Sequence, residues 1–187
     1  MRPYSEHIIN DYLVVRYQEG DKESLKILIR QFNPRLERQI YAQTSDRASL
    51  DDLVQESWYA IISGLSTLKI SISFDVWALS IARRKAIDWI RQQQLVRRKT
   101  QEIYLDDQIQ QISDGDEMDI IQERKAKLKM VIEGLPKTQK IVLSMFYLEN
   151  YSVKEISEIL EISSGTVKSR LFNARQSLKE ILKLNKG

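Results

Sequence analysis

The chain contains no cysteine and only one histidine, His7, among its 187 residues. Zinc sites, thiol nucleophiles and disulfide frameworks depend on these residue types, so all three are excluded or nearly so. The sequence therefore predicts no metal site and no cofactor, and the lack of cysteine is typical of the reducing cytoplasm. The first residues, MRPYSEHIINDYLVV, contain no long apolar run. We expect neither a secretory signal nor a membrane span.

Glycine and proline are also scarce, at 6 and 3 residues. Apolar residues recur at spacings of three and four almost everywhere, and no strand-like alternation stands out. The expected fold is all-α, with an N-terminal helical bundle and a C-terminal helix-turn-helix domain joined by a linker.

Positive charge is missing from one stretch. Residues 101–123 hold eight Asp and Glu and no Lys or Arg, whereas residues 1–100 carry a net charge of +4 and residues 124–187 one of +7. This pattern predicts an N-terminal domain (1–99), an acidic linker (100–123) and a C-terminal domain (124–187). Two basic blocks suit a polyanion, but by themselves they leave nucleic-acid binding and mere solubility equally open.

The N-terminal block contains clear helix signals. Gly20-Asp21 is typical of a helix stop followed by an N-cap, and the next apolar stripe ends before Pro34. Ser49 is predicted to cap a helix whose first carboxylates, Asp51 and Asp52, complement the helix dipole. The buried side of that helix is expected to comprise Leu53, Val54, Trp58, Ile61 and Leu65.

A helix predicted over residues 74–91 has two unlike faces. Its core stripe comprises Leu79, Ala82, Ala86 and Ile90, and its opposite face comprises Trp77, Ser80, Arg84, Asp88 and Arg91. An aromatic residue at the head of a charged row suits stacking and phosphate contact on a single strand. Taken alone, these residues fit better with an alternative in which Trp77 covers a neighbouring helix and the charges are solvated.

Residues 152–175 have the pattern of a helix-turn-helix unit. Ser152 and Glu155 predict a capping box, Glu161-Ile162 the turn, and Ser163 the cap of a second helix that begins at Ser164. The first helix should bury Ile156, Ile159 and Leu160, and the second Val167, Leu171, Ala174 and Leu178.

The polar side of the second helix suits base reading. It presents Thr166, Ser169, Arg170 and Asn173, with Lys168 and Arg175 on its flanks. Such a row can exchange hydrogen bonds with base edges in a major groove while the flanking cations bind phosphates. The alternative is a solvated face on a helical hairpin, which agrees less well with two caps and a short turn.

Two parts of the chain resemble a known family. Residues 132–182 resemble the promoter-reading C-terminal domain of bacterial sigma factors, and GTVKSRL..AR..L is a signature of their ECF (extracytoplasmic-function) group. DDLVQESW at 51–58 and FDVWALSIARRKAIDWIR at 74–91 resemble the N-terminal domain of the same family. Response regulators carry related helix-turn-helix domains, but the two resemblances in this order are specific to sigma factors.

The resemblance implies an alternative-type sigma factor that binds RNA polymerase core and directs promoter-specific initiation. The polymerase performs the synthesis, so the chain is expected not to be an enzyme and to use no small-molecule substrate. An anti-sigma factor is expected as a further partner, which could hold this cytoplasmic protein at the membrane.

The resemblance also implies a role for each group of candidate residues. Asp52, Gln55 and Glu56 would contact the β and β′ subunits of the polymerase. Trp77, Arg84, Asp88 and Arg91 would read the melted minus-ten element, and the loop over residues 65–73 would capture a flipped base. The minus-thirty-five duplex would be contacted by Ser164, Thr166, Lys168, Ser169, Arg170, Asn173 and Arg175.

Three residues depart from the family pattern. Arg84 stands where Asn is usual, Glu161 replaces the usual turn Gly, and Ser157 replaces a small Ala at the helix crossing. The first puts the minus-ten base preference in doubt. The second should weaken the turn, because a residue with a Cβ must adopt or avoid the left-handed conformation.

Other classes of protein remain as alternatives. An autonomous DNA-binding regulator would bind duplex DNA tightly without polymerase, and a polymerase-binding protein without promoter recognition would join the core but yield no specific transcript. A metal-dependent nuclease built on Asp51, Asp52 and Glu56 lacks a remote ligand set.

Overall fold

Every regular element that the computed structural model describes is a helix. The described residues are 5–69, 72–100, 132 and 134–184. The helices are α1 (Ser5–Gln18), α2 (Lys22–Thr44), α3 (Leu50–Leu65), α4 (Phe74–Thr100), α6 (Lys137–Tyr147), α7 (Val153–Leu160) and α8 (Ser164–Leu184). This confirms the expected all-α class. Beyond Thr100, the segment predicted as an acidic linker lies outside the described residues.

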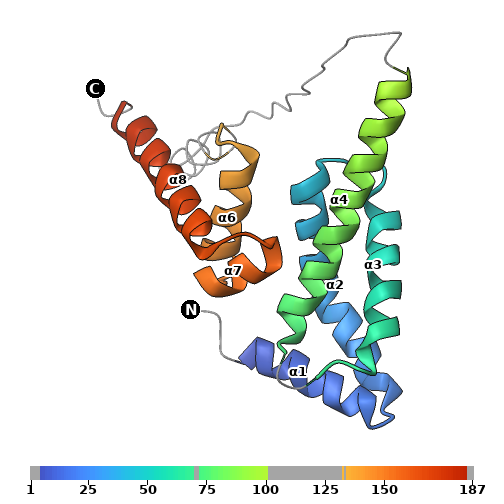
Figure 1. Ribbon diagram of the computed structural model, residues 1–187. Helices are drawn as coiled ribbons and strands as arrows, with labels where there is room; N and C mark the ends of the chain where they lie inside the picture. The colour runs from blue at the N-terminus through green and yellow to red at the C-terminus, as the bar shows by residue number, and fades with distance from the viewer. Residues whose placement is uncertain (1–4, 70–71, 101–131, 133, 185–187) are drawn as a thin grey trace, which may run out of the picture.

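The N-terminal helices form a bundle with one helix across its end. Figure 1 shows α2, α3 and α4 side by side, with α1 crossing their lower end. The core between them contains Leu28, Phe32, Ile61, Phe74 and Leu79, all with no exposed surface. The rings of Phe32 and Phe74 meet edge to face with their centroids 4.9 Å apart. None of the described helices is long and apolar enough to cross a membrane.

Local signals set the start of α2 but not its end. Gly20 adopts φ 102°, and Asp21 caps α2 by accepting a hydrogen bond from the Glu23 amide. The Ser24 hydroxyl also donates to Asp21 at 2.9 Å and lowers the pKa of its carboxyl group. The expectation that the apolar stripe ends before Pro34 is wrong, because α2 continues to Thr44 with Leu36 and Ile40 completely buried. Tertiary burial has outweighed the local preference of proline.

The start of α3 is closed by a residue other than the predicted one. Ser49 occupies the N-cap position, but its side chain makes no capping hydrogen bond. Asp46 accepts bonds from the amides of Ala48 and Ser49 instead, at 3.3 and 3.2 Å. Hydrogen bonding with the Ser49 side chain lowers the pKa of Asp46. The expected buried side of α3 is confirmed in full.

A buried polar cluster ties three helices together. Asp75 on α4 has no exposed surface and accepts hydrogen bonds from Asn10 of α1 at 2.7 Å and from Arg35 of α2 at 2.8 Å. Asp11 of α1 accepts a further bond, from the Phe74 amide at 2.9 Å. α1 thereby fixes the first turn of α4, where the predicted nucleic-acid face begins.

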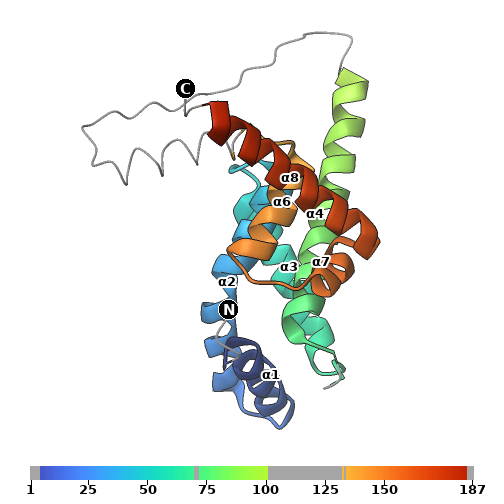
Figure 2. The same ribbon diagram turned by 90° about the vertical axis from the view of Figure 1, so that its left-hand side faces the viewer.

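The C-terminal helices pack against the bundle. Figures 1 and 2 show α7 beside α4 and α8 along the outer side of α6 and α7. One apolar core cluster joins Ile141, Met145 and Leu160 of this part to the N-terminal core. The predicted stripe of α8 is mostly confirmed: Val167, Leu171 and Ala174 are buried, whereas Leu178 is only partly buried, against a smaller cluster with Leu135 and Leu143.

Candidate nucleic-acid interface

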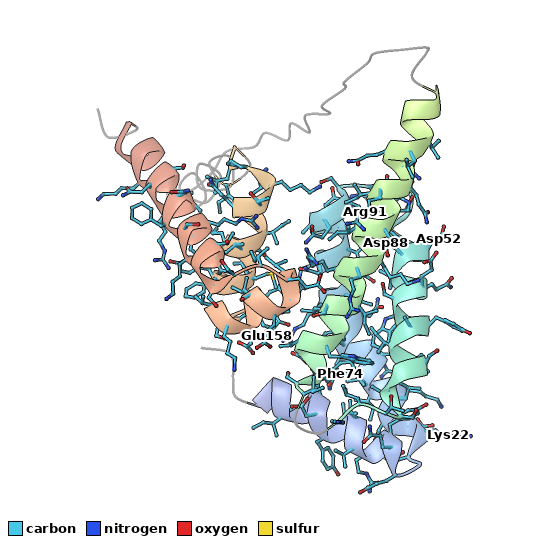
Figure 3. The ribbon with its side chains drawn as sticks, in the orientation of Figure 1. Lys22, Asp52, Phe74, Asp88, Arg91 and Glu158 are labelled. Carbon is cyan, nitrogen blue, oxygen red and sulfur yellow. The ribbon has the colours of Figure 1, made fainter. Side chains whose placement is uncertain are left out.

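The exposed side of α3 carries the residues predicted to bind polymerase. Asp52, Gln55 and Glu56 are exposed, and the neighbouring Leu53 and Val54 are buried. The three polar side chains share one face because residues three and four apart lie on the same side of a helix. Figure 3 shows Asp52 at the same end of the bundle as the labelled residues Asp88 and Arg91 of α4.

Sequence reasoning missed a tyrosine on this face. Tyr59, three residues after Glu56, is 79% exposed. The available signal was its spacing, because Tyr59 lies four residues after Gln55 and outside the buried stripe of α3. Tyrosine is enriched in protein interfaces, so the acidic face gains an aromatic side chain suited to contact. At its edge, Glu56 pairs with Lys85 of α4 at 3.3 Å.

The predicted single-strand face of α4 divides into a packed head and an exposed row. Arg84, Asp88 and Arg91 are 58%, 62% and 72% exposed, and the last two form an ion pair at 3.6 Å. Trp77 is half-buried and packs over Gly64 of α3 so closely that a Cβ at Gly64 would lie 2.9 Å from its Cζ2. Trp77 therefore covers a neighbouring helix, as the alternative predicted, and only its remaining surface heads the charged row.

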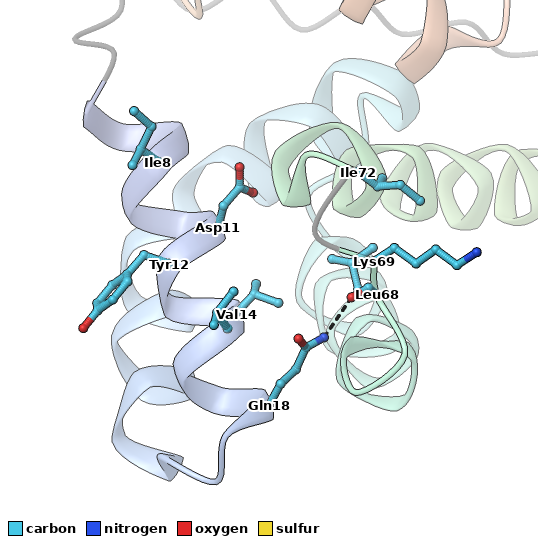
Figure 4. A pocket seen from close by; sticks show the side chains of 9 residues that line it. Ile8, Asp11, Tyr12, Val14, Gln18, Leu68, Lys69 and Ile72 are labelled. Atoms are coloured by element: carbon cyan, nitrogen blue, oxygen red, sulfur yellow. Dashed lines mark hydrogen bonds between the residues drawn. The ribbon is translucent and has the colours of Figure 1, made fainter.

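A pocket lies between α1 and the loop that precedes α4. It has a volume of ≈ 270 Å³ and a mainly apolar lining that includes Ile8, Tyr12, Val14, Leu68 and Ile72. Figure 4 shows these side chains on opposite walls, with Gln18 bridging them. Gln18 donates from Nε2 to the carbonyls of Leu65 and Leu68, at 2.8 and 2.9 Å. α1 thus holds the described part of the predicted base-capturing loop in place.

The helix-turn-helix geometry follows its sequence signals closely. Ser152 and Glu155 form the predicted capping box, with bonds of 3.2 and 2.7 Å. Ser163 caps α8 by accepting from the Thr166 amide at 3.0 Å. Glu161 adopts the left-handed conformation at φ 50°, so the position usual for Gly is strained here. Ser157, another departure from the family pattern, donates to the Ile162 carbonyl at 2.6 Å and braces the same turn.

The base-reading row of α8 is only partly open. Ser164, Lys168, Ser169 and Asn173 are exposed, whereas Thr166 and Arg170 are half-buried. Thr166 exchanges a hydrogen bond with Ser163 at 2.8 Å. Arg170 lines a cavity at the junction with the N-terminal bundle, together with Gln43 and Arg83. The arginine predicted to read bases is thus partly enclosed between the two domains.

The flank of α8 presents cationic and aromatic side chains. Arg175 donates from Nε to the Tyr147 hydroxyl at 2.8 Å, and its guanidinium lies 5.7 and 5.5 Å from the ring centres of Phe146 and Tyr147. Phe172, one turn earlier on this flank, is 60% exposed. Sequence reasoning missed Phe172. The available signal was its place outside the buried stripe of Val167, Leu171 and Ala174.

Comparison with known proteins gives two family matches. Residues 28–96 match the model described as Sigma-70 region 2, and residues 125–178 match the model described as Sigma-70, region 4. Together the matches contain the exposed face of α3, the charged row of α4 and the helix-turn-helix unit. The order of the two is the one that the motifs predicted.

Curated relatives match over nearly their whole length. The ECF RNA polymerase sigma factor SigX of Bacillus subtilis is 25% identical over 167 residues, which are 87% of this chain and 86% of the relative. The ECF RNA polymerase sigma-E factor of Haemophilus influenzae is 26% identical over 183 residues, covering 93% of this chain and 95% of the relative.

Two solved structures share the fold. The sigma factor RpoE of Bartonella quintana, solved in complex with the anti-sigma factor NepR, aligns with a TM-score of 0.65 and 18% identity over 86% of this chain and 98% of that one. CnrH, solved in complex with the cytosolic domain of CnrY, aligns with a TM-score of 0.62 and 16% identity over 94% and 98% of the two chains.

Proposed function

We propose a specific mode of promoter reading for this chain, which belongs to the sigma-70 family and is an ECF-type sigma factor. In this proposal it reads the minus-ten element as single-stranded DNA and the minus-thirty-five element as duplex DNA. Proteins of this family bind RNA polymerase and direct promoter-specific initiation, and the polymerase performs the synthesis. The observation that carries the proposal is that an acidic α3 face, a charged α4 row and a capped helix-turn-helix unit occur in one chain in the family's order.

For the minus-ten element, the proposal assigns Arg84, Asp88 and Arg91 to contacts with the separated strand, with the remaining surface of Trp77 at their head. The pocket between α1 and the loop supports capture of an unstacked base, because its apolar lining and polar rim suit a flat heterocycle. Contacts with the captured base offset a few kcal/mol of unstacking and thereby favour melted DNA.

For the minus-thirty-five element, α8 enters the major groove. Thr166, Ser169, Arg170 and Asn173 read base edges, and Ser164, Lys168 and Arg175 contact the backbone. The exposure of Phe172 beside Lys168 supports an apolar contact with a thymine methyl group, a contact that aromatic side chains make. Each good bidentate base contact contributes about 1–3 kcal/mol of discrimination.

The partners of the proposal are the polymerase core, promoter DNA and an anti-sigma factor. Asp52, Gln55 and Glu56, together with Tyr59, form the surface for the β and β′ subunits. NepR is such a partner for the Bartonella RpoE, and we expect this chain to have one of its own. The boundaries 1–99, 100–123 and 124–187 remain our proposal for the two domains and their linker.

In vitro transcription with purified core polymerase on genomic fragments tests the proposal. We expect transcripts that begin at defined sites only when the chain is added. Arg170→Ala should then weaken transcription selectively by promoter sequence, since it removes a base contact. Tight duplex binding without any polymerase dependence would favour the autonomous regulator, and core binding without specific transcripts would favour the polymerase-binding protein that lacks promoter recognition.

A further inference from the structure

The turn of the helix-turn-helix unit contains a strained residue at the junction of the two domains. Glu161 has φ 50° and ψ 45°, a left-handed conformation that glycine adopts freely and that a Cβ disfavours. Glycine would form this turn with less strain, so the presence of glutamate calls for a role of its side chain. A persistent backbone outlier is a reason to look for function at that position.

The Glu161 carboxylate reaches two adjacent guanidinium groups of α4. Its Oε2 accepts a hydrogen bond from Nη1 of Arg83 at 2.9 Å, and its Oε1 lies 3.6 Å from Nε of Arg84. The Arg83 side chain is only 16% exposed, so this pair is partly shielded from solvent. Arg84 and Glu161 are also two of the three positions where the sequence departs from the family pattern. The side chains of these two residues are in contact.

An apolar seam surrounds these ion pairs. Leu160 of α7 and Ile141 of α6 are buried, and with Ile162 they line the cavity of ≈ 190 Å³ that also contains Arg83 and Arg170. The cavity would otherwise bring two cations together, and the carboxylate of Glu161 beside it offsets their repulsion. Charge and apolar contact therefore both favour the closed arrangement seen in Figures 1 and 2.

The closed arrangement cannot serve both promoter elements at once. The names of the elements place them about 25 base pairs apart, which is about 85 Å of B-form duplex at 3.4 Å per base pair. In this structure Glu161, two residues before the cap of α8, touches Arg84 in the middle of the minus-ten row. The segment from Ser164 to Asn173 is about 15 Å long at 1.5 Å per residue. The two reading faces must separate before both can bind.

We propose that Glu161, Arg83 and Arg84 form an intramolecular latch, which holds the helix-turn-helix domain on the N-terminal bundle and withholds Arg84 and Arg170 from promoter DNA. The inference rests on the proposed function, because it concerns the access of the same DNA-reading residues. Partly exposed ion pairs are individually weak and are screened by salt. Raised salt should therefore weaken the ionic part of the latch, whereas the apolar contacts of Ile141 and Leu160 remain.

The latch is tested by the distance between the domains in solution. Because the chain has no native cysteine, Gln31→Cys on α2 and Gln176→Cys on α8 allow a donor and an acceptor dye to be attached for energy transfer. Glu161→Gln should lower the ratio of closed to open molecules at low salt by about two- to fivefold, the range that a partly exposed ion pair supports. Added salt should lower energy transfer in the wild-type protein and change energy transfer in Glu161→Gln little.

Two further variants make the result decisive. Glu161→Gly removes the carboxylate and relieves the left-handed strain, so it should open the molecule while folding at least as stably, as followed by circular dichroism. Glu158→Gln removes the same charge from an exposed position three residues earlier on α7 and should leave energy transfer unchanged. Equal energy transfer in the wild type and both Glu161 variants would overturn the latch.

Binding of DNA in the absence of polymerase tests the second half of the proposal. The probe is a duplex fragment that carries a minus-thirty-five element mapped by the transcription experiment. Glu161→Gln and Glu161→Gly should bind it about two- to fivefold more tightly than the wild type, in line with the change in open population. An open variant with unchanged affinity would contradict the withholding of Arg170. Failure of every variant to support transcription would contradict the proposed function, whereas the energy-transfer result would still decide the latch.

Discussion

At the scale of single residues, the helix-turn-helix unit shows how few side chains define a turn. The capping box of Ser152 and Glu155 and the cap by Ser163 satisfy amides that an isolated helix start leaves without partners. Glu161 adopts the left-handed conformation that glycine adopts most easily, and the Ser157 hydroxyl donates to the adjacent Ile162 carbonyl. A residue that strains the turn is thus accompanied by a side chain that supports it.

Ser152→Ala should lower the free energy of unfolding by about 1 kcal/mol, because it removes the hydroxyl that accepts a hydrogen bond from the Glu155 amide. Urea denaturation followed by circular dichroism measures the change. Ser63→Ala is the matched control, since Ser63 is exposed within α3 and its hydroxyl only returns to the Tyr59 carbonyl. A loss in the control as large as in Ser152→Ala would refute the role of the cap.

At the scale of elements, the contact of α3 with α4 depends on a glycine. Gly64 lets the Trp77 ring lie directly on the backbone of α3, and the neighbouring Phe74 ring lies 6.4 Å from it, centre to centre. A half-buried tryptophan at this crossing fixes the head of the charged row on α4. Packing and the proposed DNA contact therefore share one side chain.

Gly64→Ala should destabilise the bundle, because the new Cβ would lie 2.9 Å from Trp77 Cζ2. Overpacking costs about 1–3 kcal/mol, and the better helix propensity of alanine returns about 1 kcal/mol. We expect a net loss of about 1 kcal/mol in urea denaturation and a shift in tryptophan fluorescence. Gly165→Ala is the control, since the nearest atom to its Cβ is 3.7 Å away. An unchanged stability and spectrum for Gly64→Ala would show that Trp77 is free to move.

At the scale of the whole molecule, the proposed polymerase surface on α3 and the proposed base-reading residue Arg170 of α8 lie in different parts of the fold. Asp52, Gln55 and Glu56 face outward from α3, whereas Arg170 lies at the junction with α6 and α7. The proposed polymerase surface is thus exposed in the closed arrangement, whereas the proposed latch must open before Arg170 can reach DNA fully. We therefore expect core binding to precede promoter reading.

Asp52→Lys with Glu56→Lys should strongly weaken binding to core polymerase, because it reverses the charge of the surface proposed to contact the β and β′ subunits. We expect at least a tenfold loss of affinity in a pull-down or fluorescence titration, about 1.4 kcal/mol or more. Glu23→Lys, on the exposed start of α2, is the control. Retained holoenzyme formation by the double variant, with native helicity, would rule out the assignment.

The sequence by itself determined the helical class, both helix caps of the helix-turn-helix unit and the buried stripes of α3 and most of those of α4 and α8. These features depend on residues three or four apart, and local periodicity encodes them. Only the tertiary structure decided that α2 continues through Pro34, that Trp77 packs on Gly64, and that Glu161 meets Arg83 across 78 positions of the chain. Such contacts depend on how whole helices pack, and no local pattern specifies the partner of a side chain on a distant helix.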